Sequence, residues 1–564
     1  MEHKQHIERF KNIKSDRSTW NHQFQLLGEY ISQVKQNFEA SQTPGEFLNE
    51  DIFDSLGTFA AHNSASALLG LLWPGSAKQS IEIVPPKDLE DDGEVKEFYE
   101  NMHDRTVSAM DNPTANLSLA LDEYMLDQMI FGTSGVGVDE GETSKLLFKP
   151  YGVKEMYIEE GRGGKVIEIY LLFEWRLGRV VDEYGIDEVS EGLRKKYNDG
   201  KRDEKVKILH VITPRDKPKA EEGALAMPIA SIHIEYDGNH TIKESGFNEM
   251  PIAVGRFRKL NYERYGRSPG MMALPDIREA NALREAVIVA TEKILNMPKG
   301  VFNDSTFGGG VIDTSPNSIT VFNSEGQGGQ TPIFDIGAPP DVNVALVRLE
   351  ALRDSIAQHF NIDRLLDFNN DQEMTFGEAQ IRNNIRISSL ASLFARQITE
   401  VFTPIIERSV NILFRKGEFG VIPGSEEEQE LLDQGVQDIE YIPDVLIERL
   451  ERGESIYEVR YKTQAAAASR AEDYRAIIET IGFVGQISQI DPSAIKRIDY
   501  HEAIKEMASI RSLPAGIVKA DEVVEAEAEA EAKARQAQQE MEMLQQGAAV
   551  AKDVAPLMQN GNNQ

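Results

Sequence analysis

The chain has 564 residues, 41% hydrophobic and 27% charged, so it is long enough for several domains and apolar enough to form buried cores. Its formal net charge of −33 argues against a protein that binds DNA tightly over its whole surface, since such proteins have basic patches. Cysteine is absent, which excludes disulfides, thiolate catalysis and cysteine zinc sites, and fits assembly in a reducing cytoplasm.

The N-terminal 130 residues are expected to be helical. The first residues are densely charged and lack the apolar run of a signal peptide. The most apolar stretch, Gly57–Trp73, is shorter than a membrane span and contains His62 and Asn63, so a buried helix ended by Pro74 is expected. Helical spacing is seen at Phe10, Trp20, Phe24, Leu27 and Ile31, and further helices are expected over 50–73, 93–111 and 115–130.

Between residues 134 and 258 the apolar period changes to that of β-strands. The stretch 155–175 has two β-rich runs around Gly161–Gly164, which predicts a hairpin. A strand is expected at 206–215, and Asp237-Gly238 lies between two alternating runs, which predicts a second hairpin. This region is therefore expected to be a β-rich insert between helical regions.

A turn-rich corner over residues 261–277, NYERYGRSPGMMALPDI, leads into a long helical pattern. Pro275 suits the first turn of a helix, and Asp276 would then lie at the positive end of the helix dipole. The helix is expected over 274–297, roughly 36 Å at 1.5 Å per residue. Its apolar stripe comprises Ile277, Ala280, Leu283, Val287, Ala290 and Ile294, and Pro298 and Gly300 would end it.

Residues 301–341 are rich in glycine and proline and contain short β-rich runs, which predicts a small β module. A second long helix is expected over 342–366, so that two long helices would flank the module. The stripe of this second helix comprises Leu346, Leu349, Leu352, Ile356 and Phe360.

A polar break at 367–375 precedes a third long helix, expected over 376–415. Thr375 and Glu378 have the spacing of a capping box, and Pro404 is expected to kink the helix because its ring removes an internal hydrogen bond. Downstream, a strand is expected at 455–463 and an alanine-rich helical region at 464–508. The acidic end of the chain is typical of a helix with hardly any apolar face, followed by a disordered tail.

Motifs for catalysis and cofactor binding are missing from the sequence. It contains no GxxxxGK[ST] phosphate loop and no HExxH motif, and the glycines at 135–141 lack the spacing of a dinucleotide loop. His233 and His240 could form a metal pair, but positions on the face and turn of a hairpin are the favoured interpretation. The run Gly308–Gly310 is interpreted as a loop. No catalytic residue, metal site or cofactor is therefore expected.

The order of these elements resembles a bacteriophage portal protein, the head-to-tail connector family of short-tailed, podovirus-type phages. The resemblance spans most of residues 50–415 and is strongest in the long helix with its corner, at 265–301. The other stretches that support it are SALLGLLWP, HVITPRD, ESGFNEMPIAVGRFR and MTFGEAQIR, in that order along the chain.

The resemblance implies an α+β, mainly helical portal fold with wing, stem, clip and crown regions. Its long stem helices would line the central channel of a ring of about 12 subunits. The implied regions are an N-terminal part of the wing at 1–273, stem helices at 274–300 and 342–366, a clip at 301–341, a tunnel loop at 367–375, the rest of the wing at 376–463, a crown at 464–515, and a C-terminal helix (a possible barrel) with its tail at 516–564.

The resemblance also implies a function without enzymatic activity and without a membrane. The ring would sit at one vertex of the capsid in the virion, after assembly in the bacterial cytoplasm. Double-stranded DNA would pass through it, without sequence specificity, during packaging and ejection. The implied protein partners are the terminase large subunit, then tail adaptor and nozzle proteins, together with major capsid and scaffolding proteins.

Three groups of site residues follow from the resemblance. Tunnel-loop residues would face DNA, cations of the stem would face the channel or a neighbouring subunit, and a rigid corner would set the angle of the first stem helix. Twelve copies would have a formal charge of −33 × 12 = −396, so a mainly acidic lumen would repel phosphate and let the duplex slide. The groups are Asn369, Asn370, Asp371, Gln372 and Glu373; Arg278, Arg284, Lys293 and Lys299; and Gly266, Pro269, Gly270 and Pro275.

Two alternatives to this interpretation stay open. One is another structural or scaffolding protein of a virion, without a DNA channel. The other is a hydrolase that uses acidic residues and a divalent metal, although no compact motif of acidic residues and histidine supports it.

Overall fold

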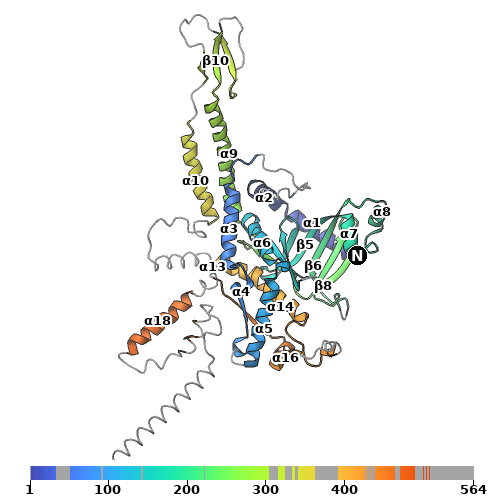
Figure 1. The fold of residues 1–564 in the computed structure, drawn as a ribbon. Helices are drawn as coiled ribbons and strands as arrows, with labels where there is room; N and C mark the ends of the chain where they lie inside the picture. The colour runs from blue at the N-terminus through green and yellow to red at the C-terminus, as the bar shows by residue number, and fades with distance from the viewer. Residues whose placement is uncertain are drawn as a thin grey trace, which may run out of the picture. The chain divides into compact units, whose positions relative to one another are not determined.

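The computed structural model contains both helices and strands, as the sequence predicts (Figure 1). It forms two compact units. Unit 1 comprises residues 1–81, 104–420 and 463–468, and unit 2 comprises residues 82–103, 421–462 and 469–564. Within these units the structure describes residues 2–32, 38, 51–89, 93–141, 144–220, 223–303, 315–323, 333–336, 341–361, 391–425, 428–429, 432, 439–463, 471–488, 500, 503–504 and 507.

The N-terminal part of unit 1 is helical, as expected. The apolar stretch around residue 60 forms a largely buried helix that ends at Leu72, directly before Trp73 and Pro74. No helix in the described residues is both long and apolar enough to cross a membrane. The elements are α1 (Glu2–Asp16), α2 (Ser18–Leu27), the π-helical turn η1 (Gly28–Ser32), α3 (Leu56–Leu72), α4 (Ala77–Ser80), the 3-10 turn η3 (Pro113–Ala115) and α6 (Leu117–Phe131).

The β-rich region forms two antiparallel sheets in unit 1. The larger has the order β4-β5-β6-β7-β8 and the smaller the order β3-β2-β9, and both predicted hairpins are confirmed as the pairs β4–β5 and β7–β8. The bounds are β2 (Thr133–Glu140), β3 (Leu146–Gly152), β4 (Met156–Glu160), β5 (Val166–Arg176), β6 (Lys205–Pro214), β7 (Ile229–Glu235), β8 (His240–Phe247) and β9 (Ile252–Arg256).

Two short helices interrupt this region and were not predicted from the sequence. They are α7 (Leu177–Tyr184) and α8 (Glu191–Asn198), and the hydroxyl of Ser190 caps α8 by accepting a hydrogen bond from the backbone N–H of Leu193. Both helices place apolar residues against β5, β6 and β8, in a cluster that includes Val180, Leu193 and Ile208. Eight residues are too few for the apolar period to distinguish a helix from a loop.

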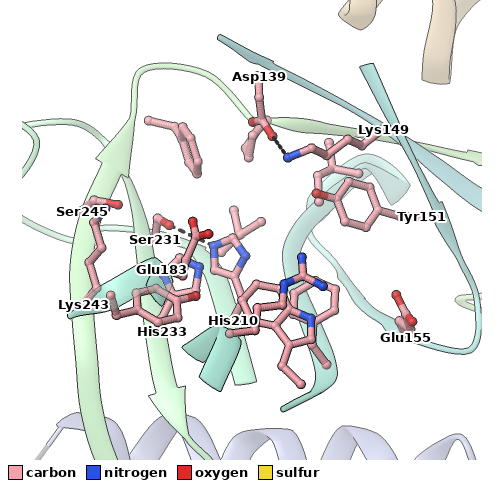
Figure 2. Close-up of a pocket in the computed structure, with 18 of the residues that line it drawn as sticks. Asp139, Lys149, Tyr151, Glu155, Glu183, His210, Ser231, His233, Lys243 and Ser245 are labelled. Atoms are coloured by element: carbon pink, nitrogen blue, oxygen red, sulfur yellow. Dashed lines mark hydrogen bonds and ion pairs between the residues drawn. The ribbon is translucent and has the colours of Figure 1, made fainter. Parts of the chain in front are cut away.

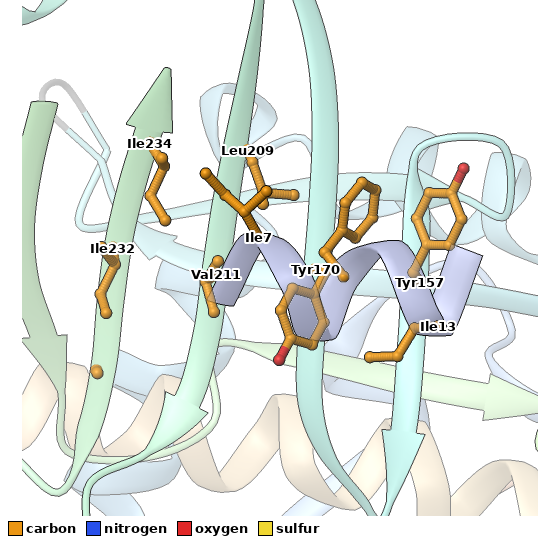
Figure 3. Packing of buried hydrophobic residues seen from close by; sticks show 10 residues of the cluster. Ile7, Ile13, Tyr157, Tyr170, Leu209, Val211, Ile232 and Ile234 are labelled. Atoms are coloured by element: carbon orange, nitrogen blue, oxygen red, sulfur yellow. The ribbon is translucent and has the colours of Figure 1, made fainter. Parts of the chain in front are cut away.

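One face of the larger sheet is covered by α1, whose buried residues Ile7, Phe10 and Ile13 lie across the strands (Figure 3). Phe10 contacts the ring of Tyr157 edge-on, with centroids 4.9 Å apart. The strands contribute every second residue to this core, as a pleated strand requires. Their contributions are Tyr157, Tyr170, Leu209, Val211, Ala230, Ile232 and Ile234.

Two long helices and a three-stranded sheet follow the corner. Helix α9 (Pro269–Leu295) and helix α10 (Asn343–His359) lie side by side, and the small sheet lies between them in the chain (Figure 1). The sheet has the order β11-β10-β12, from β10 (Lys299–Asn303), β11 (Ile319–Asn323) and β12 (Ile333–Asp335). The predicted β module is thus confirmed in its described part, whereas Gly308–Gly310 lies outside the described residues.

The bounds of both long helices differ from the prediction. Helix α9 begins at Pro269, five residues before 274, because the hydroxyl of Ser268 accepts a hydrogen bond from the backbone N–H of Met271 and so caps it. The described α10 ends at His359 rather than 366, since Asn361 adopts a left-handed backbone conformation with φ of 54°.

The third long helix is described over residues 391–415, while the predicted cap at Thr375 and Glu378 lies outside the described residues. Instead of a simple kink at Pro404, a π-helical segment, η5 (Ile398–Phe402), separates α13 (Ala391–Gln397) from α14 (Thr403–Arg415). Proline has no N–H to donate to the carbonyl of Glu400, so the regular hydrogen-bond pattern cannot continue through this turn.

Unit 2 contains the pair of strands β1 (Ile81–Val84) and β13 (Glu458–Tyr461), and β13 confirms the strand predicted at 455–463. The hydroxyl of Tyr99 donates to the backbone carbonyl of Ile456, which connects the first half of α5 (Gly93–Met110) to the segment before β13. Its other helices are the 3-10 turn η2 (Lys87–Leu89), α16 (Asp444–Glu451) and α18 (Ala471–Ser488). The helix predicted near the end of the chain, over 516–547, lies outside the described residues.

Candidate functional site

The corner before α9 is held by two backbone segments in direct contact. A Cβ atom added at Gly266 would lie 2.2 Å from the carbonyl oxygen of Gly132 and 3.0 Å from the backbone nitrogen of Phe257. The backbone N–H of Phe257 donates to that same carbonyl at 2.9 Å, and the N–H of Gly266 donates to the hydroxyl of Thr133 at 2.8 Å. Only glycine fits at 266, so the corner is sterically fixed against the end of α6.

The first turn of α9 is docked onto the same end of α6. The hydroxyl of Ser268 donates to the carbonyl of Ile130 at 2.7 Å, and a Cβ at Gly270 would lie 3.0 Å from that oxygen. Pro269 occupies the start of the helix, where its missing N–H removes no helical hydrogen bond. The corner residues Gly266, Pro269 and Gly270 are therefore brought together in one buried junction.

The prediction that Pro275 opens the helix is wrong, because Pro275 lies inside α9 with its ring exposed. Asp276 consequently does not lie at the N-terminal, positive end of the helix dipole. Its carboxylate instead accepts a hydrogen bond from the hydroxyl of Ser355 at 2.6 Å and lies 3.5 Å from the imidazole of His359, both on α10. Asp276 therefore links the two long helices.

A buried arginine connects the corner to the third long helix. Arg256, at the end of β9, is 2% exposed and contacts the Glu400 carboxylate on η5 through its backbone N–H at 3.0 Å and its guanidinium at 2.8 Å. The same guanidinium forms an ion pair with Glu160 and donates to the carbonyl of Gly164 at 2.7 Å. A single side chain thus joins β4, β9 and η5 directly before the corner.

Helices α9 and α10 pack antiparallel, as the positions of their polar contacts show. Arg348 forms a two-point ion pair with Glu279, at 2.8 and 3.1 Å, and this hydrogen bonding raises the pKa of the guanidinium. Both helices also contain buried apolar residues, and Ile277 lies against α3 at Gly57. The buried apolar residues are Ile277, Ala280 and Val287 on α9 and Leu349, Leu352 and Ile356 on α10.

Helix α9 is also fixed, through Asn281, to residues 51–54, the segment before α3. The side-chain oxygen of Asn281 accepts hydrogen bonds from the backbone N–H groups of Phe53 at 2.7 Å and Asp54 at 3.2 Å. Its amide donates to the carbonyl of Asp51 at 2.9 Å. Asp54 in turn lies 3.4 Å from the guanidinium of Arg353 on α10. These contacts hold both helices at the same end.

Several large apolar side chains of α9 and α10 are exposed in the described structure. Val344 and Val347 on α10 are 74% and 68% exposed, and Leu295 on α9 is 76% exposed. Ile294 and Leu346, which belong to the two predicted apolar stripes, are also exposed in the described structure. The other exposed apolar residues here are Ile288 and Val289. The exposed apolar residues of the two helices are a candidate interaction surface and are together called the apolar strip: Ile288, Val289, Ile294, Leu295, Val344, Leu346 and Val347.

The four cations named from the sequence lie along α9 and at the start of β10. Arg278 is exposed, with its guanidinium 5.7 Å from the centre of the Tyr30 ring, and Lys299 lies 3.4 Å from Asp335 of β12. Arg284 and Lys293 are half-buried, and neither has an ion-pair partner among the described residues. The predicted stem cations therefore include two exposed side chains, Arg278 and Lys299, and two half-buried ones.

The tunnel-loop residues Asn369, Asn370, Asp371, Gln372 and Glu373 lie outside the described residues, so their role stays a prediction. Among the residues that the structure describes, no group of three or more histidine, aspartate or glutamate side chains could hold a metal ion. His240, one member of the histidine pair considered in the sequence, contacts the carbonyl of Glu188 at 2.9 Å through Nε2.

Sequence reasoning missed Arg256, Glu400 and Asn281, which fix the corner and the helix pair. Their long-range partners lie 92 to 230 residues away in the chain, and a local sequence pattern does not reveal such contacts. The one available signal was an arginine in the run IAVGR, at the end of a strand that is otherwise buried. A buried arginine needs acceptors for its N–H groups, but the sequence does not identify which residues supply them.

Comparison with known proteins gives a consistent assignment. The family model described as "Bacteriophage head to tail connecting protein" matches residues 3–518. The portal protein of Salmonella phage epsilon15 is 23% identical over 533 residues, which cover 92% of this chain and 89% of that protein. The probable portal protein of Bordetella phage BPP-1 is 22% identical over 505 residues, which cover 87% and 84%.

Two solved structures match with low scores. One is the virion of a native gene transfer agent particle, with 9% identity and a TM-score of 0.28, covering 76% of this chain and 99% of that chain. The other is the neck of an empty gene transfer agent particle, with 10% identity, a TM-score of 0.33 and coverages of 77% and 99%. At these TM-scores the likeness says nothing about how the regions of this chain are arranged.

The family match covers nearly the whole chain, and both curated relatives match over most of their own length; the matched family is structural rather than enzymatic. The chain therefore belongs to the bacteriophage head to tail connecting proteins, the family of the phage portal proteins.

Proposed function

We propose that this chain forms a ring of about 12 copies at one vertex of a phage capsid, and that double-stranded DNA passes through the ring during packaging and ejection. In this proposal α9 and α10 are the stem helices, the sheet β11-β10-β12 is part of the clip, and residues 367–375 are the tunnel loop. The chain hydrolyses nothing itself. The alternative is a virion structural or scaffolding protein without a channel, which would not need a closed ring.

The observation that most supports a ring is the exposure of the apolar strip residues of α9 and α10. Large valine and leucine side chains on a long helix pair are unfavourable in water, at about 25 cal/mol per Å² of exposed apolar surface. A second copy of the same helix pair can cover the strip on each side. Because such a contact is head-to-tail rather than two-fold, it closes into a ring when the rotation per subunit is a whole fraction of a turn.

The charge of the chain fits a channel that DNA slides through. With −33 per copy, twelve copies repel the phosphate backbone overall, so contacts with DNA should be few, weak and independent of sequence. Arg278, Arg284 and Lys293 are the stem cations available for such contacts or for ion pairs between subunits. The polar tunnel-loop residues Asn369, Asn370 and Gln372 would touch the backbone without holding it.

The clip is the proposed docking platform for terminase and later for tail adaptor proteins. In the described residues, β11 and β12 each pair only with β10, so both edges of the small sheet have backbone groups open to another strand. The proposal places this sheet at the end of the stem, where a partner can reach every copy in the ring. Capsid and scaffolding proteins would contact the wing.

The ring proposal is tested by placing charge in the apolar strip. The double variant Val344→Asp and Val347→Asp should remain folded, since both side chains are exposed in a single chain, but it should fail to form rings in size-exclusion chromatography with light scattering. The matched control is Asn343→Asp, which adds charge at an exposed position of the same helix and should still form rings. Normal assembly of the double variant would contradict the role given to the strip.

The tunnel loop is tested separately, by alanine substitutions at residues 369–372 in the phage. The proposal expects intact rings but reduced packaging yield or altered ejection. If both packaging and ejection are unchanged, the loop has no part in the mechanism.

A further inference from the structure

The face of the larger sheet opposite to α1 contains a cavity of about 580 Å³ (Figure 2). Its floor is formed by strands β5 to β8 and the end of α7, and the opposing wall by residues of β2, β3 and β9. This volume lies within the range of pockets that bury a ligand group, about 300–1,000 Å³. Nothing in the function proposed above uses it.

The floor of the cavity is a row of five planar rings. Phe173 stacks on Trp175 with centroids 5.6 Å apart, and Trp175 stacks on Tyr184 at 6.4 Å. The row continues to His233, 5.4 Å from Tyr184, and ends at His210, 3.9 Å from His233. Phe173, Trp175 and Tyr184 are only half-buried, so their surfaces remain available to an incoming group.

The two histidines contribute polar ring atoms to the floor of the cavity, where a bound group could form a hydrogen bond with them. They are direct neighbours across β6 and β7, where the opposite face has only aliphatic and aromatic residues. His210 is satisfied by the hydroxyl of Ser231, at 2.9 Å from Nε2, but Nδ1 of His233 has no partner in the described residues. A buried polar atom without a partner destabilises a fold by about 1–3 kcal/mol, which an occupant able to hydrogen-bond would recover.

The charge around the cavity identifies the kind of occupant. Three cations and three anions line it, so their formal charges cancel, whereas the whole chain has 93 acidic against 60 basic residues. One pair is already neutralised within the wall, since Lys149 lies 3.6 Å from Asp139. The guanidinium of Arg179 covers one face of Trp175 at 4.1 Å. A net-neutral, ring-lined cavity favours an uncharged occupant, because a charge that enters it loses its hydration and meets as many like charges as opposite ones.

We propose that this cavity is a docking pocket for an uncharged aromatic side chain, tyrosine above all, presented by a loop of a partner protein. The aromatic ring would extend the existing row by stacking or edge contacts, which add about 0.5–1.5 kcal/mol beyond burial. The phenol hydroxyl can both donate and accept, so it suits an imidazole edge such as that of His233. Buried aromatic anchors of this type commonly dominate protein interfaces.

The test uses saturation-transfer difference NMR, which detects weak binding to a large protein. The probes are N-acetyltyrosinamide, N-acetylphenylalaninamide and N-acetylleucinamide, each added to the full-length protein. The tyrosine probe should give at least a fivefold stronger signal than the leucine probe, with phenylalanine between them. Equal signals for tyrosine and leucine probes would overturn the proposal.

Two variants separate the pocket from the rest of the surface. Ser245→Trp should fill the cavity from β8, and Trp175→Leu should remove the central ring, and each should reduce the tyrosine signal at least fivefold. The control Tyr197→Leu removes the ring of another cation–π pair on the same region, with Arg202 at 4.7 Å, outside the cavity, and should keep the signal. Persistence of the signal in both pocket variants would also overturn the proposal. Because the assay does not depend on ring formation, its failure is distinguishable from failure of the proposed function.

Discussion

Lowering the pH from 7.5 to 5.5 should open the larger sheet at β6 and β7 far more often, because His210 and His233 are neutral in the fold. Burial lowers the pKa of His233 to about 4 and lowers that of His210 well below the usual value of 6.5. The charged groups around the pair are Lys243, Lys149, Arg179, Asp139, Glu155 and Glu183. For a base with a depressed folded pKa, the stabilisation is complete above pH 6.5 and is lost as the pH falls toward about 4.

The size of the effect follows from proton linkage. At pH 5.5 an exposed histidine with a pKa of 6.5 is protonated about tenfold over neutral, whereas the buried one stays neutral. Each histidine therefore lowers the free energy of opening by about 1.4 kcal/mol, and the pair by about 2.7 kcal/mol between pH 7.5 and 5.5. In hydrogen exchange, this corresponds to a loss of protection on the order of 100-fold after correction for the intrinsic exchange rate.

The measurement is hydrogen exchange with mass spectrometry on peptides covering β6 and β7, at pH 7.5, 6.5 and 5.5. The matched variant His210→Gln with His233→Gln cannot titrate at these positions, so its protection should change much less with pH, even if its absolute stability is lower. Protection factors that do not depend on pH in the wild type, or an equal loss in the variant, would refute the reasoning.

Three further predictions concern the corner and the helix pair. Gly266→Ala should destabilise unit 1 by about 3 kcal/mol because the new methyl group meets backbone atoms that cannot move aside, whereas Gly70→Ala, with nothing within 4 Å, should be neutral or stabilising in thermal melts; equal melting temperatures would contradict the steric argument. Arg256→Met should cost about 1.5–3 kcal/mol, because Glu400 and Glu160 lose their buried partner and keep only Arg396 and Lys259 as counter-ions. Arg258→Met, at an exposed position, should have little effect in the same melts. Asn281→Ala should lower the free energy of unfolding by about 1–3 kcal/mol and reduce hydrogen-exchange protection at residues 53–54. Unchanged protection there would show that Asn281 does not hold this segment against α9.

Much of the element order could be predicted because it depends on local chemistry. The two hairpins have turn residues between alternating runs, and the buried helix before Pro74 shows a continuous apolar pattern. The error at the start of α9 shows the limit of such rules. Proline fits a first turn, but the serine cap at Ser268 decides where the helix begins, and an exposed Pro275 is tolerated inside it.

The residues that fix the site could not be found in this way, because their partners are distant in the chain. Arg256 is recognisable as functional only once β9 lies beside η5, and Asn281 only once residues 51–54 lie against α9. The histidine pair is a similar case. Each histidine alternates with aliphatic residues in its own strand, and only the register of β6 with β7 places the two rings in contact.

The central claim is that many copies of this chain close into one ring around a channel. An end-on class average of the purified full-length protein by negative-stain electron microscopy tests it most directly. The account predicts a closed ring with a central hole wide enough for a DNA duplex, built from about 12 equal wedges. Particles that remain single chains under every assembly condition, or that associate without a central hole, would contradict it.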